Sequence, residues 1–219
     1  MIQSLTQVLG PWGCALVTMA CAYLLGSLSF AIIVCKLTLG RDIRDYGSGN
    51  AGLTNAYRTM GGAKTLLVLL GDLAKAAAAL AIGGALLGQG GKLLAGAFVI
   101  MGHVYPAYFG FRGGKGVLVG AMTLLLFDWR IFLIALGLFI VAVAVTRWVS
   151  LGSILGAISF PFTMYYFYRS PLYTVVAVVL SGAVIYLHRS NIKRILAGKE
   201  NKFTLHSKPQ ITKDEEAHK

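Results

Sequence analysis

Long apolar segments recur along almost the whole chain, and they restrict the possible folds more than any other feature of the sequence. Seven such segments run roughly over residues 13–35, 64–88, 93–110, 117–127, 131–146, 149–167 and 172–187. A helix needs about 20 residues to cross the hydrocarbon core of a bilayer, and about 17 is near the lower limit. Most of the segments reach or approach this length once their flanks are counted. The pattern therefore predicts an all-α integral membrane protein with seven transmembrane helices.

The composition agrees with this class. Hydrophobic residues make up 57% of the 219-residue chain and charged residues only 13%, whereas soluble domains carry about a quarter charged residues. A water-soluble fold of this size could not bury so much apolar surface. Nothing is left over for a separate soluble domain, so we expect one membrane domain over residues 1–219, with a flexible cytoplasmic tail over about 204–219.

The fourth segment is too short to span a membrane by itself. It has eleven apolar residues between Gly116 and Asp128. Either it is not a span, or its helix starts inside residues 111–116 and that loop dips into the membrane.

Three polar segments interrupt the apolar pattern: residues 41–62, residues 111–116 and the stretch that begins at His188. Two spans separate the first from the second and four separate the second from the third, so all three face the same side. The net charge is +12, and the loops on the opposite side hold only Lys92, Arg130 and Arg169. Positive residues concentrate on the cytoplasmic side. We therefore expect an external N-terminus, a cytoplasmic C-terminus and an active site at the cytoplasmic face.

The charge also limits the partners. The basic residues are spread over short loops rather than gathered in one stripe, which argues against nucleic acid. Membrane lipids and anionic substrates are the expected partners. Because residues 1–35 carry no charged side chain, the N-terminus is expected to be an uncleaved first span rather than a signal peptide.

Residues 47–58 read GSGNAGLTNAYR and have the composition of an anion site. Gly47, Gly49 and Gly52 allow positive φ and close approach of a ligand. Neutral hydrogen-bonding groups come from Ser48, Asn50, Thr54 and Asn55. Arg58 adds a guanidinium suited to phosphate. The alternative is a flexible loop that Thr54 caps at a helix start.

Residues 111–116 read FRGGKG and precede a helix directly. Gly113, Gly114 and Gly116 surround Lys115, so backbone N–H groups and the positive helix end are expected to converge on an anion. The spacing is not that of a nucleotide-binding P-loop. The alternative is a tight turn between helices. The short fourth segment would place this cradle at headgroup level, which suits a phosphate carried on a lipid chain.

Four further residues lie within or near the second and third spans. Asp72 and Lys75 are one turn apart, and a structural ion pair is expected, with a role near the site as the alternative. Pro106 is expected to kink the third span. His103 is more often a satisfied residue of a helix bundle than a catalyst.

Residues 188–200 read HRSNIKRILAGKE. His188 and Asn191 are three apart and would share one face of a helix. The opposite, membrane-side stripe would be Ile192, Ile195 and Leu196. A basic juxtamembrane anchor is expected from Arg189, Lys193 and Arg194, with a role at the site as the alternative.

Taken together, the three segments resemble the bacterial acyl-phosphate:glycerol-3-phosphate acyltransferase family. The matching elements are GSGNAGLTNAYR at 47–58, GHVYPAYFGFRGGKGV at 102–117 and HRSNIKRILAGKE at 188–200. They occur in the family's order and spacing, and the resemblance extends through about residue 203. It implies a seven-span enzyme of the bacterial cytoplasmic (inner) membrane. Its reaction would transfer a fatty acyl group from acyl phosphate to glycerol 3-phosphate, giving lysophosphatidate and inorganic phosphate for phospholipid synthesis. Neither acyl-CoA nor acyl carrier protein would be the donor, and no cofactor or metal is implied.

The resemblance implies roles for individual residues. The catalytic residues would be Ser48, Arg58, His188 and Asn191. The substrate- and phosphate-binding residues would be Gly47, Gly49, Asn50, Thr54, Asn55, Gly113, Gly114, Lys115, Gly116 and Ser150. The chain departs from the family at Ser190, where members usually have Glu, and at Ala76 after Lys75, where they usually have Gly.

A direct mechanism is expected, because acyl phosphate is already activated and needs no enzyme nucleophile. Either His188 or the donor's own phosphate would take the proton.

The alternative function is transport of an anionic phosphorylated metabolite, which predicts substrate sites near the membrane midplane and repeat symmetry. No internal repeat is visible. A structural scaffold would leave the glycine–lysine loop unexplained.

Overall fold

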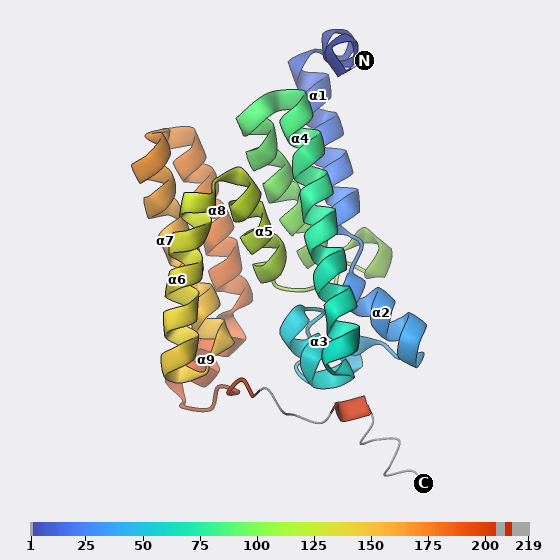
Figure 1. The fold of residues 1–219 in the computed structure, drawn as a ribbon, viewed down its shortest axis with the longest axis vertical. Coiled ribbons are helices and arrows are strands. Elements are labelled where there is room, and N and C mark those ends of the chain that lie inside the picture. The colour runs from blue at the N-terminus through green and yellow to red at the C-terminus, as the bar shows by residue number, and fades with distance from the viewer. Residues whose placement is uncertain (1, 205–208, 212–219) are drawn as a thin grey trace. The chain divides into compact units, whose positions relative to one another are not determined.

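A computed structural model describes residues 2–204 and 209–211 of the protein. Every regular element within these residues is a helix. The chain divides into two compact units, the first up to Thr123 together with residues 209–211, and the second from Leu124 to residue 204. Figure 1 shows the helices of both units, and each unit is described by itself.

The first apolar segment forms two helices rather than one. α1 (Ile2–Gly26) and α2 (Phe30–Leu39) are separated by a break at residues 27–29. Carbonyl groups at such a break lack their usual helical donors. The ammonium of Lys75 donates to two of them, Gly26 O at 3.0 Å and Leu28 O at 2.7 Å. A buried cation thus stabilises the break.

The second and third apolar segments lie in α4 (Gly62–Val104). Its backbone leaves the helical conformation at Leu87 and at Gly88, which has φ 59°, and the chain turns back on itself there (Figure 1). The two halves pack closely at Gly83 and Gly91, where a side chain on either residue would collide with the backbone of the other. The two expected spans are therefore an antiparallel hairpin, against which α1 packs.

Short elements carry the polar segments of the first unit. They are η1 (Ile43–Asp45), α3 (Leu53–Met60) and η2 (Ala107–Phe109). The helix that follows, α5 (Val117–Phe127), coincides with the fourth apolar segment and has 11 residues. It begins after residues 111–116, so these residues form a loop and are not the start of the helix.

A small core beneath the first polar loop includes one residue of the expected tail. Ile43 is fully buried, Met60 is 4% exposed, and Ile211 packs in the same cluster at 5%. Residues 205–208 and 212–219 of the expected tail lie outside the described residues.

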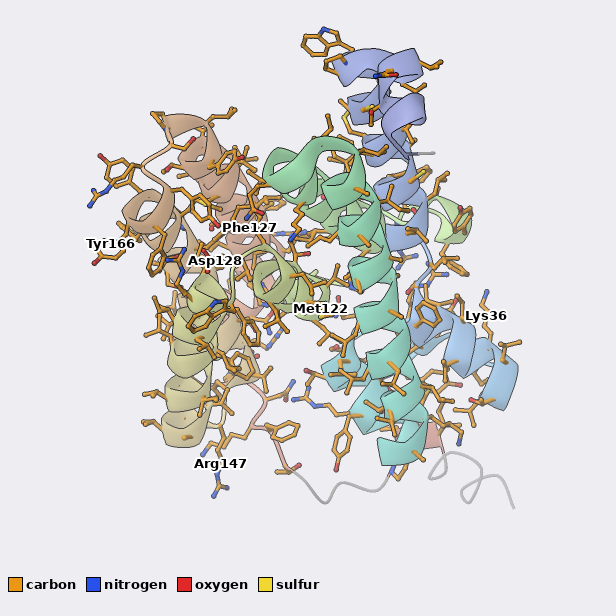
Figure 2. The ribbon with its side chains drawn as sticks, turned by 45° about the horizontal axis from the view of Figure 1, so that its top comes forward. Lys36, Met122, Phe127, Asp128, Arg147 and Tyr166 are labelled. Carbon is orange, nitrogen blue, oxygen red and sulfur yellow. The ribbon has the colours of Figure 1, made fainter. Side chains whose placement is uncertain are left out.

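The second unit is built from three long helices and a short one. They are α6 (Trp129–Thr146), α7 (Val149–Tyr168), α8 (Pro171–Leu187) and α9 (Arg189–Leu196). The three long helices pack in chain order, and α9 bends away from α8 by 58°. Figure 2 shows Asp128 at the start of α6 and Arg147 at its other end.

Length and composition identify four stretches of helix able to cross a membrane: Thr6–Leu39, Gly62–Phe109, Trp129–Thr146 and Val149–Tyr168. The bent pair of α8 and α9 makes a fifth if it counts as one span. The all-helical membrane class is therefore as predicted. The count is below seven because the α4 hairpin is one stretch of helix and α5 is short, so seven spans stay a prediction.

Candidate active site

The side-chain amide of Asn55 holds the first polar loop. Its Oδ1 accepts a hydrogen bond from the amide of Ser48 at 2.9 Å, and its Nδ2 donates to the carbonyls of Ile43 and Tyr46 at 3.3 and 3.1 Å. Asn55 is 2% exposed. Both ends of its amide are used within the protein, so Asn55 positions Ser48. A contact between Asn55 and a substrate stays a prediction.

The glycines of this loop have different roles. Gly47 and Gly49 have φ of 59° and 70°, as expected. Gly52 instead has an ordinary φ of −137° and is the N-cap of α3; a Cβ there would come within 2.8 Å of the side-chain nitrogen of Asn50. Thr54 lies inside α3 and does not cap it.

The two ends of the segment carry the predicted catalytic groups. Ser48 is exposed on the loop, and half-buried Arg58 lies in the last turn of α3. A hydroxyl and a guanidinium are thus presented by one short loop and the helix that follows it.

The second polar loop folds back onto the end of α4. The amide of Gly113 donates to Val104 O at 3.0 Å, and that of Gly114 donates to His103 O at 3.1 Å. These two amides are therefore used by α4 carbonyls and do not converge on an anion, contrary to the expectation. The N-terminus of α5 follows this loop, and the first amides of a helix lack carbonyl partners within the helix.

Gly114 is the point where the two loops meet. A Cβ at Gly114 would collide with Nε2 of His103 and lie 2.8 Å from the carbonyl oxygen of Ala51 in the first loop. A Cβ at Gly113 would collide with the carbonyl of His103. Both positions therefore need glycine because of close packing. Gly116 needs it for a φ of 77° at the start of α5.

A buried ionic cluster lies beside Gly114. Lys75 Nζ is 2.8 Å from Asp72 Oδ1 and 3.1 Å from His103 Nδ1, and all three side chains are at most 4% exposed. The expected ion pair is confirmed, and it extends to His103. Because an ammonium only donates, Nδ1 accepts and Nε2, which faces Gly114, carries the hydrogen. Pro106 lies beyond the end of α4 and does not kink it.

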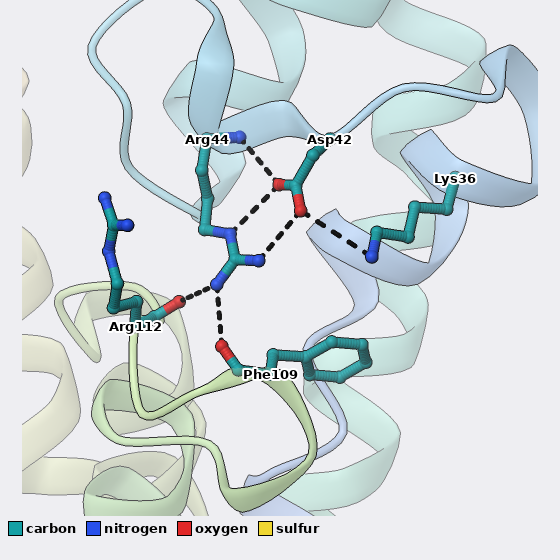
Figure 3. Close-up of polar contacts among 5 residues, drawn as sticks. All are labelled: Lys36, Asp42, Arg44, Phe109 and Arg112. Carbon is teal, nitrogen blue, oxygen red and sulfur yellow. Dashed lines mark hydrogen bonds and ion pairs between the residues drawn. The ribbon is translucent and has the colours of Figure 1, made fainter.

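Arg44 bonds to the second loop from η1, a connection that sequence reasoning missed. Its Nε and Nη2 donate to the Asp42 carboxylate at 3.0 and 2.8 Å. Its Nη1 donates to Phe109 O at 2.7 Å and to Arg112 O at 3.2 Å (Figure 3). The hydrogen bond from Arg44 lowers the pKa of Asp42, although partial burial opposes this, and the same bond raises the pKa of Arg44. The pair is therefore ionised at neutral pH. The available signal was the Asp-x-Arg spacing, in which Asp42 caps a helical turn.

The carboxylate of Glu200 accepts hydrogen bonds from three side chains in the second unit. Its Oε1 accepts hydrogen bonds from Ser150 Oγ and Asn191 Nδ2, both at 2.8 Å, and its Oε2 accepts one from Arg194 Nε at 2.7 Å. Burial raises the pKa of Glu200, but the hydrogen bonds from Asn191, Arg194 and Ser150 together outweigh it and lower the pKa. The sequence alone indicates no role for Glu200, because no local pattern places it beside Ser150, a residue 50 positions away.

His188 lies at the junction of α8 and α9 and is 3% exposed. Its Nδ1 is 2.8 Å from Val184 O. A carbonyl only accepts, so Nδ1 carries the hydrogen and the lone pair of the neutral ring lies on Nε2. Asn191 is 7% exposed and Leu196 is 83% exposed, so the two lie on different faces of α9. That the stripe of Ile192, Ile195 and Leu196 faces the membrane stays a prediction.

The structure therefore brings the first two polar segments together in the first unit, and it brings Asn191 and Ser150 together around Glu200 in the second. One pocket shared by all three segments stays a prediction.

Comparison with known proteins places the chain among the membrane acyltransferases. Residues 16–198 match the family described as glycerol-3-phosphate acyltransferase, and the chain belongs to this family. It is 44% identical over 187 residues to the glycerol-3-phosphate acyltransferase of Clostridioides difficile, covering 83% of this chain and 91% of that one. It is 39% identical over 183 residues to that of Bacillus subtilis, covering 83% and 93%.

Solved structures give the same result. The fold is similar to crystal structures of PlsY, an integral membrane glycerol 3-phosphate acyltransferase. The glycerol 3-phosphate form has 33% identity and a TM-score of 0.81, and the lysophosphatidic acid form has 32% and 0.78. Each match covers 87% of this chain and 96% of that chain.

Proposed function

We propose that this protein transfers a fatty acyl group from acyl phosphate to glycerol 3-phosphate, forming lysophosphatidate and inorganic phosphate in phospholipid synthesis. The observation that carries the proposal is the similarity to PlsY in two ligand forms, one with glycerol 3-phosphate and one with lysophosphatidic acid. These two molecules differ by one acyl group, as the acceptor and product of an acyl transfer must.

The basic groups of the first unit suit the handling of two phosphates. Lys115 and the N-terminus of α5 hold one phosphate, and Arg58 helps to neutralise the other. Ser48, whose backbone is fixed by Asn55, orients the reacting hydroxyl or carbonyl. The same orienting role is proposed for Asn191.

The chemistry needs no covalent enzyme intermediate. The 1-hydroxyl oxygen of glycerol 3-phosphate attacks the acyl carbonyl carbon, the bond from that carbon to the phosphate oxygen breaks, and phosphate leaves with the electron pair. The hydroxyl proton passes to His188 or to the donor's phosphate. The lone pair on Nε2 of neutral His188 suits a proton acceptor.

The proposal includes a location and a topology. The protein lies in the bacterial inner membrane with seven spans, an external N-terminus and a cytoplasmic C-terminus. The distribution of Lys and Arg supports this orientation. The four long helical stretches become seven spans when the two halves of α4 are counted separately and α5 and α8 are added.

The test uses the purified full chain with acyl phosphate and radiolabelled glycerol 3-phosphate. We expect labelled lysophosphatidate without any vesicle gradient, and none when acyl-CoA or acyl carrier protein replaces acyl phosphate. Uptake into vesicles without lipid product would instead support the transporter. Full turnover by S48A would contradict the orienting role of Ser48. Loss of turnover with retained donor binding in H188Q would support His188 as the base.

A further inference from the structure

We propose that Arg44 is a positioning residue for the phosphate-binding loop at residues 113–116. Arg44 fixes the backbone before this loop, and thereby the placement of Lys115, without binding substrate. This role rests on the proposed function, in which Lys115 holds a substrate phosphate.

The geometry of the guanidinium carries the proposal. Two of its nitrogens, Nε and Nη2, are held by Asp42, and the third, Nη1, is shared between the carbonyls of Phe109 and Arg112 (Figure 3). The Arg44 side chain is 19% exposed. A bidentate pair fixes the plane of the guanidinium, so the direction in which Nη1 points is also fixed.

The backbone that Arg44 holds leads directly into the loop. Arg44 bonds to the carbonyl of Arg112, and α4 bonds to the amides of the next two residues, Gly113 and Gly114. Three consecutive residues are therefore anchored immediately before Lys115. The carbonyl of Arg44 also lies close to Gly49, since a Cβ added at Gly49 would be 3.3 Å from that oxygen.

The charge of Arg44 is already used. Asp42 lies in a bidentate ion pair with it at 2.8 Å. A guanidinium paired in this way has little attraction left for a second anion. A variant of Asp42 therefore separates positioning from direct binding. If Arg44 positions the loop, loss of Asp42 disorders Arg44 and weakens substrate binding. If Arg44 itself binds phosphate, loss of Asp42 frees its charge and strengthens binding.

The second unit offers a matched control. Asp128 accepts hydrogen bonds from the amide, Nε and Nη2 of Arg130 at 2.9, 3.0 and 2.7 Å, which is the same turn as that of Asp42 and Arg44. The Arg130 guanidinium then lies over the ring of Phe167, 4.3 Å from its centre. R130Q thus removes an equivalent local pair at a different place.

Steady-state kinetics provide the first test. We expect R44Q to raise the KM for one substrate by about tenfold, or about 1.4 kcal/mol, with less change in kcat. The same KM should rise in K115Q and in D42N, and R44K should not restore it because lysine lacks the planar fork. The double variant R44Q/K115Q should be no worse than K115Q alone, because both changes act through one group. R130Q should leave both KM values unchanged.

Two kinetic outcomes would overturn the proposal. A lower KM in D42N, or additive effects in R44Q/K115Q, would show that Arg44 is itself a ligand. A wild-type KM in R44K would show that charge alone suffices.

Hydrogen–deuterium exchange provides a test that needs no turnover. The amides of Gly113 and Gly114 should exchange faster in R44Q than in the wild type or in R130Q. Unchanged exchange at these amides in R44Q would refute the anchoring. A wild-type protein that makes no lysophosphatidate would contradict the proposed function, while the exchange result would still decide whether Arg44 orders the loop.

Discussion

The first unit holds its candidate site residues against backbone atoms, whereas the second gathers them around one carboxylate. In the first unit, Asn55, Arg44 and Lys75 all bond to carbonyls, and Gly114 packs between an imidazole and a carbonyl. In the second, the Glu200 carboxylate accepts hydrogen bonds from three side chains. The first arrangement therefore depends on close contacts with the backbone, two of them made by cations that are themselves paired, and the second depends on one shared carboxylate.

The two units should therefore be sensitive to different substitutions. Backbone contacts at van der Waals distance tolerate no added atom, but they do not change with pH. A carboxylate that serves three donors tolerates small changes of shape, but it depends on one negative charge. Variants that add a methyl group, remove a charge or add a charge therefore test the comparison directly.

The largest effect is expected from G114A. The added Cβ would collide with Nε2 of His103 and lie 2.8 Å from Ala51 O, so the two loops must separate. A displacement of about 1 Å in such a site lowers kcat/KM by about 100-fold, which the acyl transfer assay measures.

The control for this variant is G182A, because a Cβ at Gly182 in α8 meets nothing within 4 Å. Alanine should stabilise this helix by about 0.5–1 kcal/mol and leave turnover unchanged. Wild-type activity in G114A would show that the loops do not need this close approach.

A smaller effect is expected from E200Q. Glutamine keeps the shape of the side chain but replaces one acceptor oxygen with a donor, which opposes the hydrogen bonds from Ser150, Asn191 and Arg194. We expect kcat/KM to fall about tenfold, since hydrogen bonds to a charged acceptor each contribute about 1.5–3 kcal/mol.

R194Q is the matched variant for E200Q. It removes one of the three donors, from a side chain that is 37% exposed, and leaves the bonds to Ser150 and Asn191. Its loss of kcat/KM should therefore be smaller. An R194Q enzyme as impaired as E200Q would show that the pair of Arg194 and Glu200, rather than the shared carboxylate, organises this site.

The pH dependence of stability should also differ between a variant in the second unit, E200Q, and one in the first, G114A. The pKa of Glu200 is lowered in the folded state because its hydrogen bonds outweigh the effect of burial. Its contribution to stability is therefore present above the ordinary carboxyl pKa of about 4.3 and is lost as the pH falls below it. Apparent unfolding midpoints of wild type and E200Q should converge at low pH. Those of wild type and G114A should stay apart, since the defect is steric. Parallel curves for wild type and E200Q would contradict the charge-based account.

Much of this fold could be predicted from apolar patterning. The two halves of α4 lie over the second and third segments, although the helix ends at Val104, before the predicted residue 110, and α5 has the predicted bounds. The pair of Asp72 and Lys75 could be predicted because two charges one turn apart in an apolar helix need each other. Local spacing and burial determine these features.

The rest depends on contacts between distant residues. A glycine in a sequence can mean positive φ or close packing, and only the structure shows that Gly114 serves packing and that its amide is used by α4. The hydrogen bonds of Arg44 could not be predicted, because its partners Phe109 and Arg112 are 65 and 68 residues away in the sequence. The residue types near the site and the local pair of Asp72 and Lys75 were therefore predictable, but the contacts between distant segments were not.

The smallest effect is expected from S190E, which introduces the acid that the resembled family usually has beside His188. Ser190 is exposed in the first turn of α9, where a carboxylate gains about 0.3–1 kcal/mol from the helix dipole. An exposed charge is screened by water and salt, so kcat/KM should stay within about twofold and the pH–rate profile should not move. A shift of the profile by more than about half a pH unit would mean that an acid at position 190 acts on His188. The second unit would then depend on two carboxylates, and Glu200 alone would not account for its organisation.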